Sequence, residues 1–300
     1  MKHERFLAWC LSTPWALMPE RMTAYAHVLA QKSAGGMDED DHGAPLKTGA
    51  AAGRGRTGAR SGAIAVIPVY GTIVQRASQL DMCEGGTSTQ SISNALADAM
   101  ADESVSQILL DIDSPGGSVY GVQELAAEIA AAKKPVVAIA NSLAASAAYW
   151  IGSAASEFHV TPGGEVGSIG VWTAHQDVSQ ALAEAGVKVT LISAGEFKVE
   201  GNPYEPLSAD AQGFMQSRID DYYGAFTRGV ARGRKVPVDQ VRSDMGKGRV
   251  FGADQALKSS MVDSVSTFDQ VITRMQRNLK AGAPKASRLA RAQRDLSIMG

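Results

Sequence analysis

Two stretches decide the fold of this chain: Gln107-Ile-Leu-Leu-Asp-Ile-Asp-Ser-Pro-Gly-Gly-Ser118 and Pro135-Val-Val-Ala-Ile-Ala-Asn-Ser-Leu-Ala-Ala-Ser-Ala-Ala-Tyr-Trp150. In each, a short apolar run is followed by small residues that can open a helix. Apolar runs without alternation predict strands that are buried on both faces. The hydroxyl of Ser146 could then face Gly116 and Gly117, whose loop offers free backbone N–H groups. A nucleophile beside such donors is the geometry of an acyl-transfer site.

Composition limits the function classes. With 300 residues, 45% hydrophobic and 20% charged, the chain can bury one sizeable core plus appendages. Its net charge of −2 gives no electrostatic case for binding nucleic acid or a membrane. Cys10 and Cys83 lack metal-ligand spacing and are interpreted as reduced thiols, so neither a metal nor a cofactor is expected. We expect no signal peptide, because Pro14 interrupts the first apolar run and no small-residue cleavage pattern follows it. We expect no membrane anchor, because no apolar run approaches ~20 residues.

The chain divides into four predicted parts. Residues 1–32 are predicted to be a helical docking segment, and residues 33–62, rich in Gly, Ala and Arg, a flexible linker. Residues 63–279 should form the folded domain, with strands alternating with helices around a mainly parallel sheet. Residues 280–300 should be a flexible basic tail. Further expected elements are strands at 63–70, 157–160 and 187–192 and helices at 178–185 and from 208 to about 230.

Serine is a poor nucleophile without a base, and two candidates follow Ser146 in the sequence. His175 lies just beyond a glycine-dense loop, with Asp177 close behind, so a Ser–His–Asp arrangement is conceivable. Lys198 lies in a polar turn after an expected strand. A lysine acts as a base only when it is neutral, which requires burial, and Phe197 and Val199 could supply an apolar setting. The residues alone leave both candidates open.

Four motifs in order carry a family resemblance: Asp113-Ser-Pro-Gly-Gly117, Asn141-Ser-Leu-Ala-Ala-Ser-Ala-Ala-Tyr149, Gly167-Ser-Ile-Gly-Val171 and Ser193-Ala-Gly-Glu-Phe-Lys198. They resemble the signal peptide peptidase A (protease IV) family. The resemblance implies the spiral α/β fold of Clp protease and crotonases and a Ser–Lys dyad that cuts peptide bonds. Ser146 would be the nucleophile, Lys198 the base and Ser168 a hydrogen-bond partner of the lysine amine. The N–H groups of Gly116 or Gly117 and of Ala147 would form the oxyanion hole.

The single module without an anchor is similar to the tailed-phage head maturation proteases of that family. This resemblance implies a serine endopeptidase that processes capsid, scaffold or portal proteins in the host cytoplasm or procapsid. Family members build the site between neighbouring modules, and Tyr222, Tyr223 and Phe226 are expected to be exposed, so we expect a homo-oligomer. One alternative is a cytosolic bacterial signal-peptide-peptidase-like protease. Another is a crotonase-like acyl-CoA enzyme, for which Glu165 is the only acidic candidate near the glycine loops.

Overall fold

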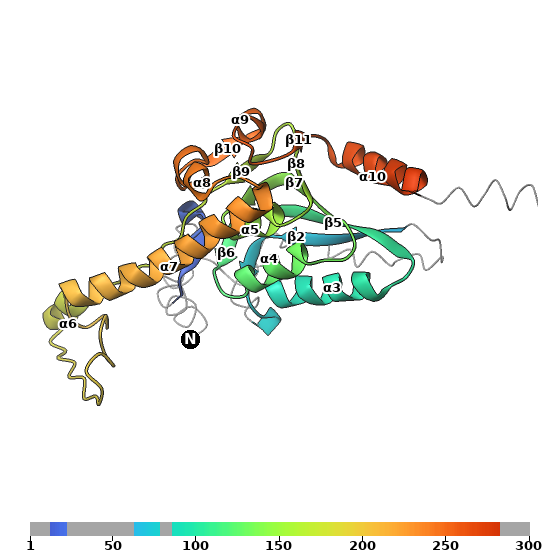
Figure 1. Ribbon diagram of the computed structural model, residues 1–300. Helices are drawn as coiled ribbons and strands as arrows, with labels where there is room; N and C mark the ends of the chain where they lie inside the picture. Colours follow the sequence, from blue (N-terminus) through green and yellow to red (C-terminus); the bar gives the residue numbers. More distant parts are fainter. Residues whose placement is uncertain (1–12, 23–62, 79–85, 283–300) are drawn as a thin grey trace, which may run out of the picture.

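The computed structural model describes residues 13–22, 63–78 and 86–282, which form two mainly parallel sheets (Figure 1). In this part of the chain, the larger sheet contains β2 (Ala63–Tyr70), β5 (Val105–Ser114), β7 (Val136–Ala145), β8 (Glu157–Val160), β9 (Glu165–Gly167), β10 (Val250–Gly252) and β11 (Ser264–Val265). The smaller sheet has the order β1 (Trp15–Leu17), β6 (Gly116–Ser118), β3 (Thr72–Val74) and β4 (Gly86–Ser88). Only β1 with β6 and β9 with β10 pair antiparallel among these strands. The predicted α/β class is confirmed.

Helices connect the parallel strands as predicted. The first three are α3 (Thr89–Ala101), α4 (Val122–Ala130) and α5 (Ala147–Ser153). Ser88 caps α3, because its hydroxyl accepts the N–H of Ser91 at 3.0 Å. Helix α4 buries the predicted stripe of Val122, Leu125, Ala126 and Ile129. The two strand–loop–helix units of the sequence therefore form side by side in one sheet.

The central strand β5 is covered on both faces, which explains its unbroken apolar run. Ile108 and Leu110 belong to the core that the sheet shares with α3, α4 and α5. Leu109, between them, packs in a second cluster that includes Val271 and Met275 of α10 (Phe268–Gly282). Full burial of such a side chain contributes about 1.5–3 kcal/mol to the free energy of folding, so both clusters stabilise the packing of the sheet against its helices.

The long helix α7 (Ala209–Arg234) lies across the helical layer, followed by α8 (Val238–Asp244) and α9 (Ala253–Lys258) (Figure 1). Phe226 is completely buried and stacks on Trp150, with ring centroids 4.8 Å apart. Tyr222 and Tyr223 are partly buried against the core. The expected exposure is therefore wrong for Phe226, which packs on Trp150 of α5, whereas Tyr222 and Tyr223 keep part of their surface exposed. The exposed aromatic of α7 is Phe214, at 58%.

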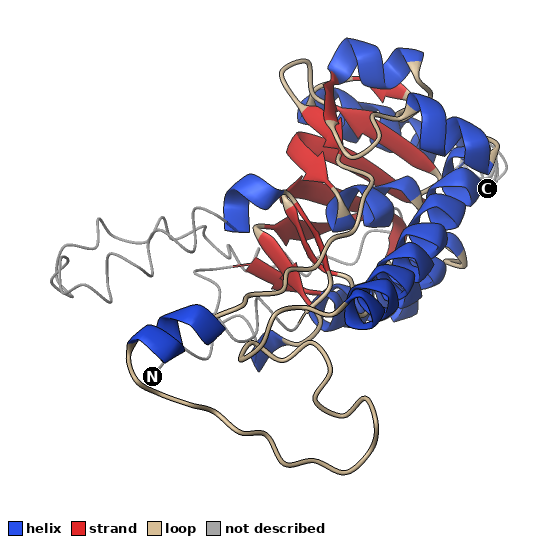
Figure 2. Ribbon diagram, turned by 90° about the vertical axis from the view of Figure 1, so that its left-hand side faces the viewer, coloured by secondary structure: helices blue, strands red, loops and turns tan. Residues whose placement is uncertain are grey.

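Two other expectations are corrected. Trp15–Leu17 is a strand and not part of a helix. Residues 187–192 form no strand and are exposed, with Ile192 at 96%. They belong to an arm, residues 173–207, which contains α6 (Ser179–Glu184) and projects from the sheet (Figures 1 and 2). The predicted linker, most of the predicted docking segment, both cysteines and residues 283–300 lie outside the described residues.

Candidate active site

Ser146 sits at the turn between β7, which ends at Ala145, and α5, which begins at Ala147. Its backbone has φ 55° and ψ −118°, a conformation that L-residues rarely adopt. The Ser146 N–H donates to the carbonyl of Gly167 at 2.7 Å, and its carbonyl accepts the N–H of Trp150. These bonds hold the sharp turn, and a side chain on such a turn stands clear of both strand and helix.

Strand β6 brings two glycines against this turn. Gly116 has φ +98°, and a Cβ added to it would lie 2.9 Å from the Cβ of Ser146. A Cβ on Gly117 would lie 1.8 Å from the carbonyl oxygen of Ile73, so no side chain fits there. The structure thus brings Ser146, Ala147, Gly116 and Gly117 together, as the sequence predicts.

Ser168 also lies beside Ser146. Strand β9 pairs with β7 so that Gly167 is opposite Ala145, which makes Ser168 the neighbour of Ser146 across the sheet. Ser168 has φ +53°, is 7% exposed and donates its N–H to the carbonyl of Arg249 at 2.8 Å. The Ser146 hydroxyl donates to the carbonyl of Gly170 at 3.4 Å, along the same loop. Ser146 and Ser168 are therefore both buried, each directly after the paired ends of β7 and β9.

Neither candidate base is bound to Ser146 within the described chain. Lys198 lies in an exposed turn of the arm, and its N–H donates to the carbonyl of Gly195 at 3.1 Å. Phe197 is 65% exposed, so the apolar setting expected around the lysine is absent from the single chain. His175 contacts the carbonyl of Asn202 through Nε2 at 3.1 Å, within the same arm. Glu165, the acidic candidate for crotonase chemistry, is exposed on β9.

The sequence did not reveal that β1 borders the site. Trp15, Ala16 and Leu17 are all buried, and β1 pairs with the glycines of β6. Its other edge faces Trp172, which follows the Ser168 loop. A three-residue strand has too little periodicity to be recognised, so only its buried partners identify it.

His159 is a buried histidine whose role is structural. Burial, followed by the charge of Arg274, lowers its pKa to about 4. Its Nδ1 lies 2.9 Å from the hydroxyl of Ser264, and Arg274 donates to Nε2. The neutral ring therefore joins β8, β11 and α10. Its side-chain partners are Ser264, Arg274 and Glu157, none of which is a predicted site residue.

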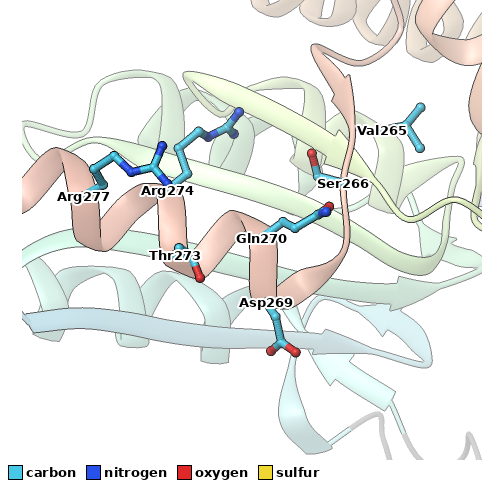
Figure 3. A pocket seen from close by; sticks show the side chains of 7 residues that line it. All are labelled: Val265, Ser266, Asp269, Gln270, Thr273, Arg274 and Arg277. Atoms are coloured by element: carbon cyan, nitrogen blue, oxygen red, sulfur yellow. The ribbon is translucent and has the colours of Figure 1, made fainter.

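An open pocket of about 520 Å³ lies at α10 and the end of β11 (Figure 3). It is lined by Val265, Ser266, Asp269, Gln270, Thr273, Arg274 and Arg277. None of these is a predicted site residue, so the pocket is separate from the candidate active site. Over the residues that the structure describes, no cluster of His, Cys, Asp or Glu is arranged to hold a metal ion. Nor does any described helix have the length and apolarity needed to cross a membrane.

Comparison with known proteins assigns this chain to a family. The Peptidase family S49 matches residues 128–282, and the Clp protease family matches residues 73–163, which include β4 to β8. The Head-tail preconnector protein GP5 of Enterobacteria phage P21 is 37% identical over 245 residues, 79% of this chain and 48% of that protein. The Capsid assembly protease C of Escherichia phage lambda is 38% identical over 226 residues, 75% of this chain and 51% of that protein.

Protease 4 of Haemophilus influenzae is more distant, at 28% identity over 216 residues, 71% of this chain and 34% of that protein. This chain spans about half the length of the two phage relatives. The family match covers the second half of the sheet, including Ser146, Ser168 and Lys198. The fold is Clp protease-like, and the chain belongs to the Peptidase family S49.

Proposed function

We propose that this chain is a serine endopeptidase in which Ser146 is the nucleophile. The observation that carries the proposal is the strained Ser146 turn, pressed against Gly116 and followed at once by the N-terminus of α5. Strained turns of this kind are maintained where a side chain must be presented to a substrate. The attack of its hydroxyl on a peptide carbonyl would form an acyl-enzyme, which water then hydrolyses.

The oxyanion hole is assigned to the N–H groups of Gly117 and Ala147. The N–H of Gly116 donates to the hydroxyl of Ser114 at 3.2 Å and is therefore occupied. Ala147 is the first residue of α5, where an N–H has no partner within its own helix. Two such donors stabilise the negative oxygen that develops during attack, and losing one typically costs ~10²–10³ in rate.

Lys198 is assigned as the general base, supplied to Ser146 by a neighbouring subunit. The arm exposes apolar side chains, among them Ile192 and Phe197, that a second subunit could cover. Covering them would desolvate the lysine and favour its neutral form. Ser168 is assigned as the hydrogen-bond partner of the lysine amine, and its position directly after β9, next to the end of β7, supports this. His175 is the weaker candidate because its ring already engages Asn202.

The proposed substrates are proteins of a phage head under assembly. The relatives with 37% and 38% identity are named for head-tail connection and capsid assembly, and each is matched over at least 75% of this chain. Protease 4 of Haemophilus influenzae is matched at 28%. The higher identity favours the phage role over a bacterial housekeeping protease, which remains the second candidate. The expected location is the host cytoplasm and the procapsid.

Alanine variants test the assignment through hydrolysis of a peptide with a small residue before the cut. Ser146→Ala and Lys198→Ala should each lower kcat/KM by at least about 10³. Lys188→Ala is the matched control, because Lys188 is another exposed lysine of the arm, and it should keep wild-type activity. His175→Ala should retain most activity. An inactive His175→Ala beside an active Lys198→Ala would replace the Ser–Lys assignment by a Ser–His site.

A further inference from the structure

The segment from Pro14 to Met18 lies between two stretches of backbone and is hydrogen-bonded to both. On one side, β1 runs antiparallel to β6, with Ala16 opposite Gly117 and Leu17 opposite Gly116. On the other side, Trp15 and Trp172 exchange N–H to carbonyl bonds of 2.8 and 2.9 Å. Trp172 also donates its indole N–H to the carbonyl of Leu17 at 2.9 Å. An extended peptide held between two strands is how many proteins bind a peptide substrate.

The register of this strand places one carbonyl at the nucleophile. Met18 donates its N–H to Pro115 at 3.1 Å, and Val119 donates to Pro14 at 3.3 Å. Antiparallel ladders alternate, so Ala16, midway between Pro14 and Met18, faces Gly117 with both its N–H and its carbonyl. The carbonyl of Ala16 therefore points at the N–H assigned to the oxyanion hole.

The Ala16 oxygen and the Ser146 side chain both lie against Gly116. A Cβ on Gly116 would lie 2.3 Å from the Ala16 oxygen and 2.9 Å from the Ser146 Cβ, so both atoms border the same point. Ser146 is only 1% exposed, with β1 lying beside it. Ala16 is completely buried, so the site encloses the methyl side chain of the residue whose carbonyl faces Gly117.

We propose that the Ala16–Leu17 peptide bond is a self-cleavage site, an inference that rests on the proposed peptidase function. Ser146 Oγ adds to the carbonyl carbon of Ala16, and the bond from that carbon to the Leu17 nitrogen breaks. The proton of Ser146 passes through the general base to the Leu17 nitrogen, which becomes a free α-amino group. Water then hydrolyses the Ala16 ester, which restores Ser146 and leaves a carboxylate on Ala16.

The uncut segment has a second consequence for activity. While β1 fills the groove, a peptide from another molecule cannot pair with β6 or reach Ser146. Only the fraction of chains whose groove is open can bind such a peptide, which lowers its apparent affinity. Release of residues 1–16 after the cut removes this competitor. The newly made enzyme would therefore be held inactive toward other proteins until it has cut itself.

Intact mass and N-terminal sequencing of the purified full chain test the proposal. The wild type should begin at Leu17, whereas Ser146→Ala should retain residues 1–16. Leu17→Pro should also stay uncut, because it removes the amide N–H of the leaving residue, while Leu17→Met keeps that N–H and should be cut. The uncut Leu17→Pro chain should hydrolyse an added peptide about tenfold more slowly than the wild type.

The same samples separate this inference from the proposed function. A wild-type chain that hydrolyses the added peptide but keeps residues 1–16 would overturn self-cleavage and leave the peptidase function standing. A cut at another bond of the segment would contradict the register that places the carbonyl of Ala16 opposite Gly117. A chain that cleaves neither the added peptide nor itself would overturn both proposals.

Discussion

Gly117 is the residue at which the site tolerates least change. A Cβ there would meet the backbone of Ile73 at 1.8 Å, and backbone cannot rotate away as a side chain can. We predict that Gly117→Ala lowers the free energy of unfolding by more than about 3 kcal/mol. Gly163→Ala is the matched control, since a Cβ there meets nothing within 4 Å, and it should change stability by less than about 0.5 kcal/mol. Urea unfolding of the two variants measures the difference, and equal midpoints would refute it.

At this scale the sequence predicts which residues gather around Ser146, whereas their catalytic roles stay predictions. Ser146, Ala147 and the two glycines lie at the ends of adjacent strands, where local pattern and sheet topology suffice to bring them together. Lys198 could not be located in the same way. Its position depends on an arm whose described hydrogen bonds join residues of the arm to one another, so they do not fix the distance of Lys198 from Ser146.

Strand β8 and helix α10 meet through His159, and this junction should make stability depend on pH. The folded-state pKa of about 4 lies below the ordinary value of 6.5, so between these values only the unfolded chain binds the proton. The stabilisation is fully present above about pH 6.5 and is lost as the pH falls toward 4, by roughly 1–3 kcal/mol. Arg274, Glu157 and Asp263 are the charged groups that face the ring.

Urea unfolding at pH 7 and pH 4.5 checks this prediction, with His159→Gln as the control variant. The variant has no titrating ring, so it should lose less stability than the wild type between the two pH values. The titration of Asp263 does not affect this comparison. Burial raises its pKa, but the hydrogen bonds from Arg234 and Phe158 outweigh burial and lower it, so its contribution is lost only at more acidic pH. Identical losses in wild type and variant would contradict the role given to His159.

The sequence predicts a helix or strand correctly where that element carries a periodic apolar pattern of its own. Strand β5 and helices α4 and α7 carry long apolar patterns and were found in place. Trp15–Leu17 was mistaken for helix because a strand of this length is defined by its partner β6 and not by its own pattern. Residues 187–192 have an apolar, β-branched pattern, yet they pair with none of the described strands.

The whole molecule should be active only as an assembly, because the base is assigned to a neighbouring subunit. We predict that mixing Ser146→Ala and Lys198→Ala chains restores activity that neither has alone. Subunits that exchange at random in equal amounts should regain about a quarter of the wild-type sites, since each site needs one intact serine and one intact lysine. Peptide hydrolysis after mixing and subunit exchange measures the recovery. No recovery, in mixtures shown by mass measurement to be mixed oligomers, would place both residues on one chain.

The most direct test of the central claim is labelling with a fluorophosphonate probe, followed by peptide mapping in a mass spectrometer. The probe reacts with serines that are activated as nucleophiles and is nearly inert toward others. The assembled wild-type chain should carry the label on Ser146, and Lys198→Ala should lose it while Lys188→Ala keeps it. A label on another serine, or none on a folded and assembled chain, would contradict the assignment of Ser146 as the nucleophile.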